Sequence, residues 1–303
     1  MPTCSSSTTL DRVLERVLIG WDGGERAEDA LALADALCRP GRSELVLARV
    51  LPRAVRGRGA ELVAELTRTA GAVGASAECL PGDSVAAGLA ELASELHADL
   101  VVVGSSCRGR IGQLLAGDVG VDLMHCSPCP VAIAPGGFRR RYAPGPRLIG
   151  VGFDGSPESR AALQSAVPLA IELAAELRLV GVVETDRLAG RAWPEPSLAI
   201  GEAVRPRRHQ LTRELDEALA ELPSSVFATG AVVSGDPARI LADKCAAGFD
   251  LLVVGSGRRS TSARALLGSV SATLAHSLSC PMLLHPRGAR TAEGARATTE
   301  YAA

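Results

Sequence analysis

The sequence predicts an α/β protein made of two doubly wound parallel-sheet domains in tandem. Two observations carry this prediction. Short runs of Val, Leu and Ile alternate with amphipathic stretches of helical period, which is typical of βαβ units with helices on both faces of a parallel sheet. The same order of elements then occurs a second time along the chain, which indicates an internal repeat.

The internal repeat can be followed through three short motifs. Each half contains an Asp after its first apolar run, a Gly-Asp pair near its middle and a Gly at the end of a later apolar run. The matched positions are Asp22 and Asp154, Gly82-Asp83 and Gly235-Asp236, and Gly104 and Gly255. Because the offset between matched positions rises from 132 residues at the Asp pair to 153 at the Gly-Asp pair, the second half holds an insertion of about 20 residues between them.

The chain divides into two predicted domains, residues 12–136 and 146–286, and a tail, residues 287–303, which has no apolar period and is expected to be disordered. The segment Gly136–Pro146 between the halves has the composition of a linker. The insertion, roughly Glu184–Arg208, contains Trp193 and several prolines, so we expect it to form a loop.

Composition excludes several classes of protein. With 303 residues, 47% of them apolar, the chain has room for two cores, while a net charge of −2 and 3% aromatic residues give no footprint for nucleic acid. No apolar run reaches the length of a membrane span and the first residues lack a signal-peptide pattern, so we expect no membrane contact and a cytoplasmic location. The eight cysteines favour reduced thiols, and we interpret Cys126 and Cys129 as a helix end that turns into a strand.

The strongest chemical signal lies near the end of the second half. The apolar run Leu251–Val254 stops at Gly255, a loop rich in Ser and Arg follows, and a helical pattern begins after Gly268-Ser269. A helix N-terminus at that point would attract phosphate. In a doubly wound sheet, ligands bind at the carboxyl ends of the strands near the switch point. We therefore expect Asp154 to lie near Gly255, and their first-half counterparts to lie near each other in the same way.

These residues carry a family resemblance that covers nearly the whole chain. The run Val151-Gly152-Phe153-Asp154-Gly155-Ser156 resembles the end of the first strand in universal stress proteins. Gly255 with Gly268-Ser269 resembles the family's later motif of Gly, two residues, Gly, nine residues, Gly, then Ser or Thr. The resemblance implies an adenine nucleotide alpha-hydrolase-like, Rossmann-like fold in each half. It also implies that the Asp contacts adenine, that the glycine loop wraps ribose and phosphates, and that a Val of the second strand lines the base pocket.

The two halves match this pattern unequally. The resemblance transfers a binding role to Asp154, Gly155, Val182, Gly255, Ser256, Arg258, Gly268 and Ser269 in the second half, and to Asp22, Val50, Gly104 and Gly117 in the first. Arg258 replaces the middle glycine of the second half, whereas in the first half Cys107 replaces it and Asp118 replaces the Ser or Thr. Because an aspartate beside a polyphosphate adds like-charge repulsion, we expect the second half to hold the better site.

Purely structural roles remain open for the same residues. Asp154 also suits the cap of a helix that begins near Pro157, Gly268-Ser269 also suits a plain helix start, and Arg258 also suits a solvated loop. Val50 and Val182 would belong to the core with or without a nucleotide. The only lysine is Lys244, and the sequence contains no phosphate-loop, nucleophile-elbow or zinc-protease motif, so we do not expect an enzyme, with slow ATP hydrolysis left open as a third alternative.

Two hypotheses of different classes follow. In the first, the chain is a stress-response regulator that binds ATP or a related adenine nucleotide in its second half, with an accompanying Mg²⁺ left open and an unidentified protein partner. In the second, it is a nucleotide-free adapter. Members of this family pair through their last strands, here Pro130–Ala134 and Pro281–His285. We therefore expect the two domains to form a pseudo-dimer within one chain, with further homodimerisation left open.

Overall fold

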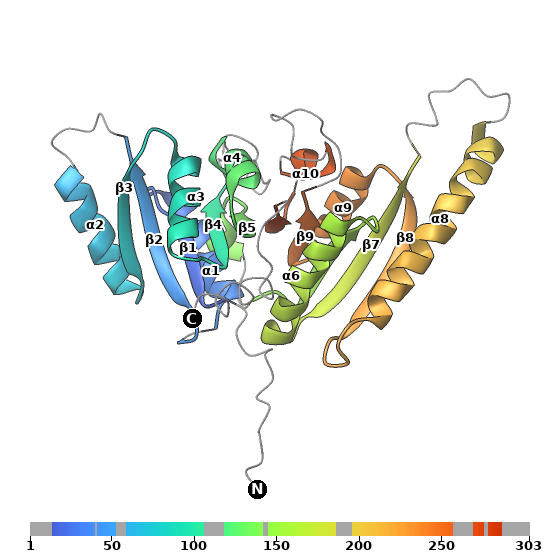
Figure 1. The fold of residues 1–303 in the computed structure, drawn as a ribbon, viewed down its shortest axis with the longest axis horizontal. Coiled ribbons are helices and arrows are strands. Elements are labelled where there is room, and N and C mark those ends of the chain that lie inside the picture. The colour runs from blue at the N-terminus through green and yellow to red at the C-terminus, as the bar shows by residue number, and fades with distance from the viewer. Residues whose placement is uncertain are drawn as a thin grey trace, which may run out of the picture.

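The computed structural model describes residues 14–39, 41–52, 59–105, 118–141, 145–185, 196–256, 269–275 and 278–286. These residues form one ten-stranded sheet with the order β3-β2-β1-β4-β5-β10-β9-β6-β7-β8 (Figure 1). Neighbouring strands within each half are parallel, and the halves meet at an antiparallel pair, β5 and β10. The predicted tandem of doubly wound parallel sheets is therefore confirmed.

The first half supplies five strands and five helices among the described residues. They are β1 (Arg16–Gly20), α1 (Glu25–Leu37), β2 (Glu44–Leu51), α2 (Gly59–Ala72), β3 (Ser76–Pro81), α3 (Val85–Glu95), β4 (Leu100–Gly104), α4 (Asp118–Cys126), β5 (Val131–Ala134) and α5 (Phe138–Arg141).

The second half repeats this order. Its described elements are β6 (Leu148–Phe153), α6 (Pro157–Leu173), β7 (Glu176–Glu184), α8 (Pro196–Ala220), β8 (Ala228–Gly235), α9 (Pro237–Ala246), β9 (Leu251–Gly255), α10 (Ser269–Leu274) and β10 (Met282–His285). Figure 1 places α2 and α8 at the two outer edges of the molecule and β5, α4 and α10 near its middle.

Two apolar layers, one on each face of the sheet, run across both halves. Helices α1, α2, α6 and α8 cover one face, and α3, α4, α9 and α10 cover the other. The central strands β4 and β9 are buried on both sides, which explains why their sequences read as continuous runs of Leu and Val rather than as alternating patterns. No helix within the described ranges combines the length and apolar character that crossing a bilayer requires.

The contact between the halves is a continuous strand pairing. Met282 pairs with Ile133, Leu283 with Ala132 and Leu284 with Val131, and these six side chains are buried. An ion pair on the α1 and α6 side joins the halves a second time, because Arg39 Nε lies 2.8 Å from Glu172 Oε1. The pairing predicted for the last strands is thus present within one chain.

The insertion differs from the expected loop. Helix α8 begins at Pro196 and continues to Ala220, so the second part of the segment Glu184–Arg208 is helical although Pro206 lies inside the helix. The reason is a buried stripe that starts before Pro206 and continues after it. Its members are Val204, Leu211, Leu215 and Ala218, whose spacings of seven, four and three residues keep them on one helical face.

The segment between the halves is also more ordered than a plain linker. Within Gly136–Pro146, residues Phe138–Arg141 form the short helix α5, and Phe138 is buried in the core. Residues 142–144 and the tail, residues 287–303, lie outside the described residues.

Candidate functional site

Each half brings the end of its first strand beside the end of its fourth. β1 pairs with both β2 and β4, and β6 pairs with both β7 and β9, so the strand order reverses at β1 and at β6. Asp22 follows β1 and Asp154 follows β6, and both are exposed. Their neighbours across the switch point are Gly104, which ends β4, and Gly255, which ends β9. The predicted juxtaposition is therefore found in both halves.

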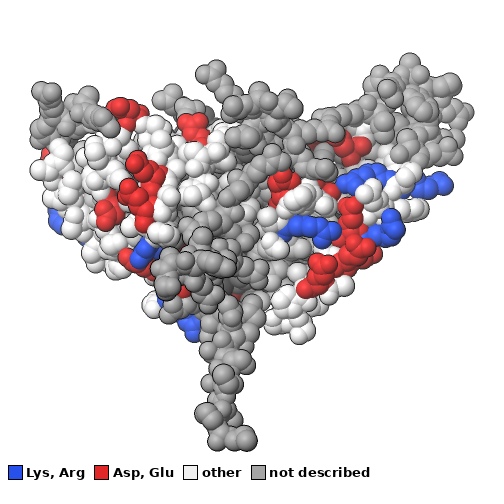
Figure 2. All heavy atoms as spheres, in the orientation of Figure 1, with Lys and Arg blue, Asp and Glu red and all other residues white. Residues whose placement is uncertain are grey.

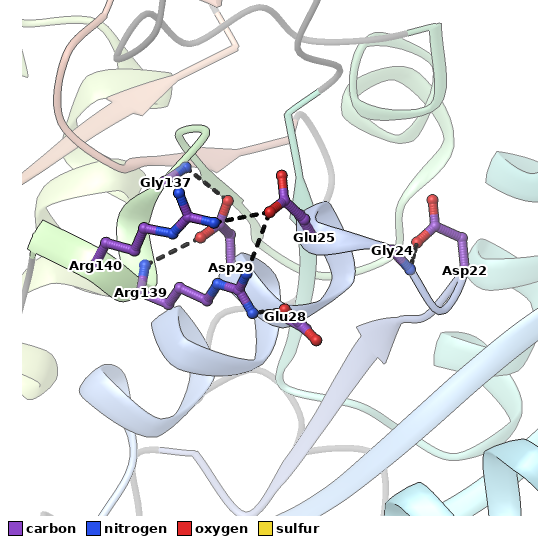
Figure 3. Close-up of polar contacts among 8 residues, drawn as sticks. All are labelled: Asp22, Gly24, Glu25, Glu28, Asp29, Gly137, Arg139 and Arg140. Atoms are coloured by element: carbon purple, nitrogen blue, oxygen red, sulfur yellow. Dashed lines mark hydrogen bonds and ion pairs between the residues drawn. The ribbon is translucent and has the colours of Figure 1, made fainter.

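The two aspartates have the same local conformation. Asp154 Oδ1 accepts hydrogen bonds from the Ser156 backbone N–H, at 3.0 Å, and from the Ser156 hydroxyl. Asp22 Oδ1 accepts one from the Gly24 backbone N–H, at 2.8 Å (Figure 3). In each turn a glycine follows the Asp in the left-handed region, Gly23 with φ 84° and Gly155 with φ 77°. The other carboxylate oxygen, Oδ2, makes no hydrogen bond to the described residues in either half.

Asp154 is not the cap of α6. Ser156 occupies that position, since its Oγ accepts a hydrogen bond from Ser159 N at 3.1 Å, and Pro157 is the first helical residue. The alternative structural role proposed for Asp154 is therefore wrong. The Asp154 carboxylate instead accepts hydrogen bonds from the capping serine through Oδ1.

Gly104 and Gly255 allow the backbone of a helix to approach the strand end closely. A Cβ at Gly104 would overlap the carbonyl oxygen of Arg26 in α1, and a Cβ at Gly255 would overlap that of Glu158 in α6. This packing requires glycine at both positions whether or not a ligand binds, so these glycines alone do not identify a site.

Ser256 is the more informative residue at this edge. Its backbone N–H donates to the His285 carbonyl of β10 at 3.1 Å, and only 3% of the residue is exposed. Its Oγ is buried and has no hydrogen-bond partner among the described residues. A buried hydroxyl without a partner costs about 1–3 kcal/mol, so this oxygen marks a place where a polar ligand atom would be stabilising.

Three of the residues to which the resemblance assigns a binding role, Gly117, Arg258 and Gly268, lie outside the described residues. Ser269 begins α10, as the motif predicts, and Ser271 Oγ donates to the Gly255 carbonyl at 2.9 Å, which ties that helix to the end of β9. No pattern in the sequence pointed to Ser271.

The two valines of the second strands are core residues to different degrees. Val50 is 9% exposed, and Val182 is partly buried. A Cβ at Gly82 or at Gly88 would lie 2.9 Å from a Val50 methyl group, so Val50 packs closely against α3 and against the segment that leads into it. Packing accounts for Val50 without a ligand, as expected for a core position.

An arginine that sequence reasoning missed contacts the Asp154 turn. Arg207 of α8 donates from Nη2 to the Asp154 carbonyl oxygen at 2.8 Å, and its Nη1 lies 3.7 Å from Glu214 Oε2. The signal was hidden because Arg207 lies in the insertion, which was expected to be a loop.

A buried carboxylate holds the start of the segment between the halves. Asp29 of α1 is 3% exposed and accepts hydrogen bonds from the backbone N–H groups of Gly137, at 2.7 Å, and Arg139, at 3.0 Å. Arg139 and Arg140 also pair with Glu25, and Arg139 pairs with Glu28 (Figure 3). Figure 3 shows Asp22 apart from this cluster, so the cluster leaves the Asp22 carboxylate unobstructed.

The cysteine pair has the structural role predicted for it. Cys126 ends α4, and Cys129 is buried just before β5 with burial raising its pKa to about 12. Within the described part of the chain, no group of three or more His, Cys, Asp or Glu side chains is arranged to hold a metal ion.

A doubly wound sheet that occurs twice, with an Asp-Gly turn at each switch point and its last strands paired, defines a tandem Rossmann-like α/β protein. The sequence model of the universal stress protein family matches residues 14–135 and 146–286. The chain therefore belongs to the universal stress protein family, as a tandem member.

Individual relatives agree with this assignment. A universal stress protein of Mycobacterium tuberculosis is 31% identical over 205 residues, which cover 65% of this chain and 64% of the relative, so the match spans less than two thirds of the relative's length. A universal stress protein of Archaeoglobus fulgidus has a similar structure, with a TM-score of 0.61, 18% identity and coverage of 90% of this chain and 98% of that chain. A functionally unknown protein of Pseudomonas aeruginosa matches with a TM-score of 0.62, 14% identity and coverage of 90% and 92%.

Proposed function

We propose that the second half binds ATP or a related adenine nucleotide at the crevice between the carboxyl ends of β6 and β9, and that the chain is a nucleotide-responsive regulator in the stress response. The observation that carries the proposal is the Asp154 carboxylate. Ser156 holds Oδ1, and Oδ2 makes no hydrogen bond to the described residues. Such an oxygen is a suitable acceptor for an amino group like that of adenine.

The buried hydroxyl of Ser256 supports the same proposal. It directly follows β9, across the switch point from Asp154, and its hydroxyl has no hydrogen-bond partner within the described ranges. A nucleotide offers ribose hydroxyl and phosphate oxygen atoms that can supply the missing hydrogen bond. The crevice therefore has one acceptor and one buried hydroxyl that fit a ligand with both donors and acceptors.

Charge favours the second half over the first. The sequence has Asp118 where the second half has Ser269, so only the first half carries an acidic residue at this motif position. Figure 2 shows mainly acidic atoms on the visible face of the first half and a mixture of basic and acidic atoms on that of the second. An aspartate beside a polyphosphate adds like-charge repulsion that a serine does not add.

The proposal is tested by titrating the protein with ATP, with and without Mg²⁺, after mass spectrometry of nucleotide released from the denatured protein. Asp154→Ala removes a charged acceptor and should weaken ATP binding by about ten- to a hundredfold. Asp22→Ala is the matched control and should change the affinity little. Equal losses in the two variants would contradict the asymmetry between the halves.

A comparison of ATP with adenosine tests the phosphate contact. If Ser269 donates to a phosphate, Ser269→Ala should weaken ATP by about ten- to a hundredfold and leave adenosine unaffected, because adenosine has no phosphate. Equal weakening of both ligands would remove Ser269 from the binding role and leave it as a plain helix start.

A nucleotide-free adapter is the alternative function. The close packing at Gly104 and Gly255 favours it, because this packing explains two motif glycines without a ligand. Failure of the parent protein to carry or bind any adenine nucleotide would select this alternative, in which the fused halves present a surface to a protein partner.

A further inference from the structure

In each half, the Asp-Gly turn is contacted by an arginine from a neighbouring element, and this arginine is paired with a glutamate. In the second half, Arg207 Nη2 donates to the Asp154 carbonyl at 2.8 Å and Nη1 lies 3.7 Å from Glu214 Oε2. In the first half, Arg49 Nη2 donates to the Asp22 carbonyl at 3.1 Å and Nη1 lies 3.7 Å from Glu65 Oε2. Each Asp peptide is thus held by a guanidinium that is itself paired with a glutamate.

The two arginines come from positions that do not correspond. Arg49 lies on strand β2 of the first half. In the second half, the strand register puts Gly181 of β7 at the equivalent position, where it pairs with Phe153 of β6. A side chain at Gly181 would be crowded, because its Cβ would lie 3.1 Å from Leu211 Cδ2 of α8. Arg207 stands one helical turn before Leu211, so α8 fills the space above the strand and also supplies the guanidinium. The same contact therefore has two different structural origins.

The two glutamates, in contrast, do correspond. Glu65-Leu66 of α2 and Glu214-Leu215 of α8 each place a buried Leu in the core and a Glu over the turn glycine. A Cβ at Gly23 would lie 3.6 Å from Glu65 Oε1, and a Cβ at Gly155 would overlap Glu214 Oε2. The glutamate lies directly against the glycine that gives the turn its left-handed conformation.

We propose that Arg207 and Glu214 are positioning residues that hold the turn of residues 154–156 in its ligand-binding form, and that Arg49 and Glu65 do the same for residues 22–24. The recurrence of one contact from two unrelated positions supports this inference. Its statement about ligand affinity rests on the proposed nucleotide function, whereas its statement about the turn does not.

The glutamate has a chemical reason to be present. A guanidinium next to Asp154 would by itself be drawn to the Asp154 carboxylate, because Arg forms paired hydrogen bonds with carboxylates. Glu214 offers a competing carboxylate, whose Oε1 also accepts from Gln210 Nε2 at 2.8 Å. Arg207 can then bind the peptide carbonyl and leave Oδ2 of Asp154 for a ligand.

Amide hydrogen exchange tests the turn without any ligand. Arg207→Ala should raise the exchange rate of the Ser156 amide, which donates to Asp154, by about tenfold or more. The amide of Ala247, which donates to Asp243 in α9, should keep its rate. Arg208→Ala is the matched control, because Arg208 is adjacent on α8 and donates to a strand carbonyl, that of Val232, away from the turn. An unchanged Ser156 rate, or equal acceleration at Ala247, would overturn the proposal.

Nucleotide titration tests the link to binding. Arg207→Ala should weaken ATP by about tenfold, and a small guanidinium compound at millimolar concentration should restore much of the loss, which a merely structural role would not allow. Glu214→Gln should weaken ATP as well, while the double variant should bind no more weakly than Arg207→Ala alone. If Arg207→Ala accelerated exchange of the Ser156 amide but left the affinity for ATP unchanged, the role of Arg207 in binding would be overturned. A parent protein that binds no nucleotide would refute the proposed function, and the exchange measurement would still decide whether Arg207 holds the turn.

Discussion

Gly104 and Gly255 each stand where a strand ends under the first turn of a helix. The backbone carbonyls of Arg26 and Glu158 occupy the space that a Cβ would need. Neither glycine has a positive φ among the described residues, so close approach rather than backbone conformation excludes other residues. Packing at a single residue can therefore require glycine at a motif position whether or not that half binds a ligand.

Substitution at these glycines should reduce stability in both halves. Gly255→Ala and Gly104→Ala force α6 or α1 to move away from the sheet, and overpacking of this kind costs about 1–3 kcal/mol. Gly71→Ala in α2 is the matched control, because a Cβ there meets no atom within 4 Å, and it should leave stability unchanged or raise it by roughly 0.5–1 kcal/mol. Urea denaturation measures the difference, and equal effects at Gly255 and Gly71 would contradict the packing account.

The sequence predicted the backbone positions of the site better than its side-chain contacts. Asp154 and Gly255 could be selected because strand ends are marked by a change from apolar to small or polar residues. Arg207 could not, because its contact with Asp154 spans 53 residues and depends on where α8 begins. The capping role of Ser156 had a signal, since a Ser directly before a Pro at the first helical position is a common helix start.

Helix α5 is held in place by α1 rather than by its own length. With four residues it cannot form a stable helix alone, and the Asp29 carboxylate binds two of its N-terminal N–H groups. The corresponding residue of α6 is Ala161, so the first half alone has this device. The first part of the linker is thereby fixed to the first half.

Removal of the Asp29 carboxylate should release this segment. Asp29→Ala leaves two N–H groups without their charged acceptor, which should lower the free energy of unfolding by about 2–4 kcal/mol and expose Arg139–Arg141 to trypsin. Asp35→Ala, an exposed position on the same helix, should change stability by less than about 0.5 kcal/mol. Cleavage at the same rate in both variants would show that α5 does not depend on Asp29.

Helix α8 shows where pattern recognition fails at the level of an element. Three prolines and a Trp favoured a loop, but Pro196 lies at the start of the helix, where proline is tolerated, and Pro206 is exposed. The buried stripe from Val204 to Ala218 was the stronger signal, since burial of one face stabilises a helix more than propensity does. A pattern search that continued through Pro206 would have found it.

The arrangement of the two sheets could be predicted more completely than the side-chain contacts between them. The repeat and the strand pattern predicted two parallel sheets, and the family resemblance predicted that their last strands pair. The second contact between the halves, from Arg39 to Glu172, could not be predicted, because it depends on the twist of the complete sheet, which brings α1 beside α6.

Buried thiols predict a loss of stability at alkaline pH. Burial raises the pKa of Cys129 to about 12 and that of Cys38 to about 11, and it also raises the pKa of Cys280. These thiols ionise near pH 9 in the unfolded chain but stay protonated in the folded chain. The contribution of these thiols to stability is therefore full below about pH 9 and is lost as the pH rises toward 11 to 12.

Urea denaturation between pH 8 and pH 11 measures this effect. Each such thiol lowers the free energy of unfolding by up to about 1.4 kcal/mol per pH unit above its unfolded pKa. Cys129→Ala should reduce stability at pH 8 by leaving a cavity, yet it should flatten the decline between pH 9 and pH 11. Parallel curves for the parent and the variant would show that Cys129 does not contribute to the decline.

The antiparallel pairing of β5 with β10 has a genetic consequence. In a dimer of identical subunits, one codon sets the residue on both sides of the axis, so neither site can change without the other. Here the two sides are encoded separately, and matched positions hold Asp29 and Ala161, Asp118 and Ser269, Arg49 and Gly181. Mutation can therefore turn one half into a permanent scaffold while the other keeps its chemistry, and the partners can neither dissociate nor exchange.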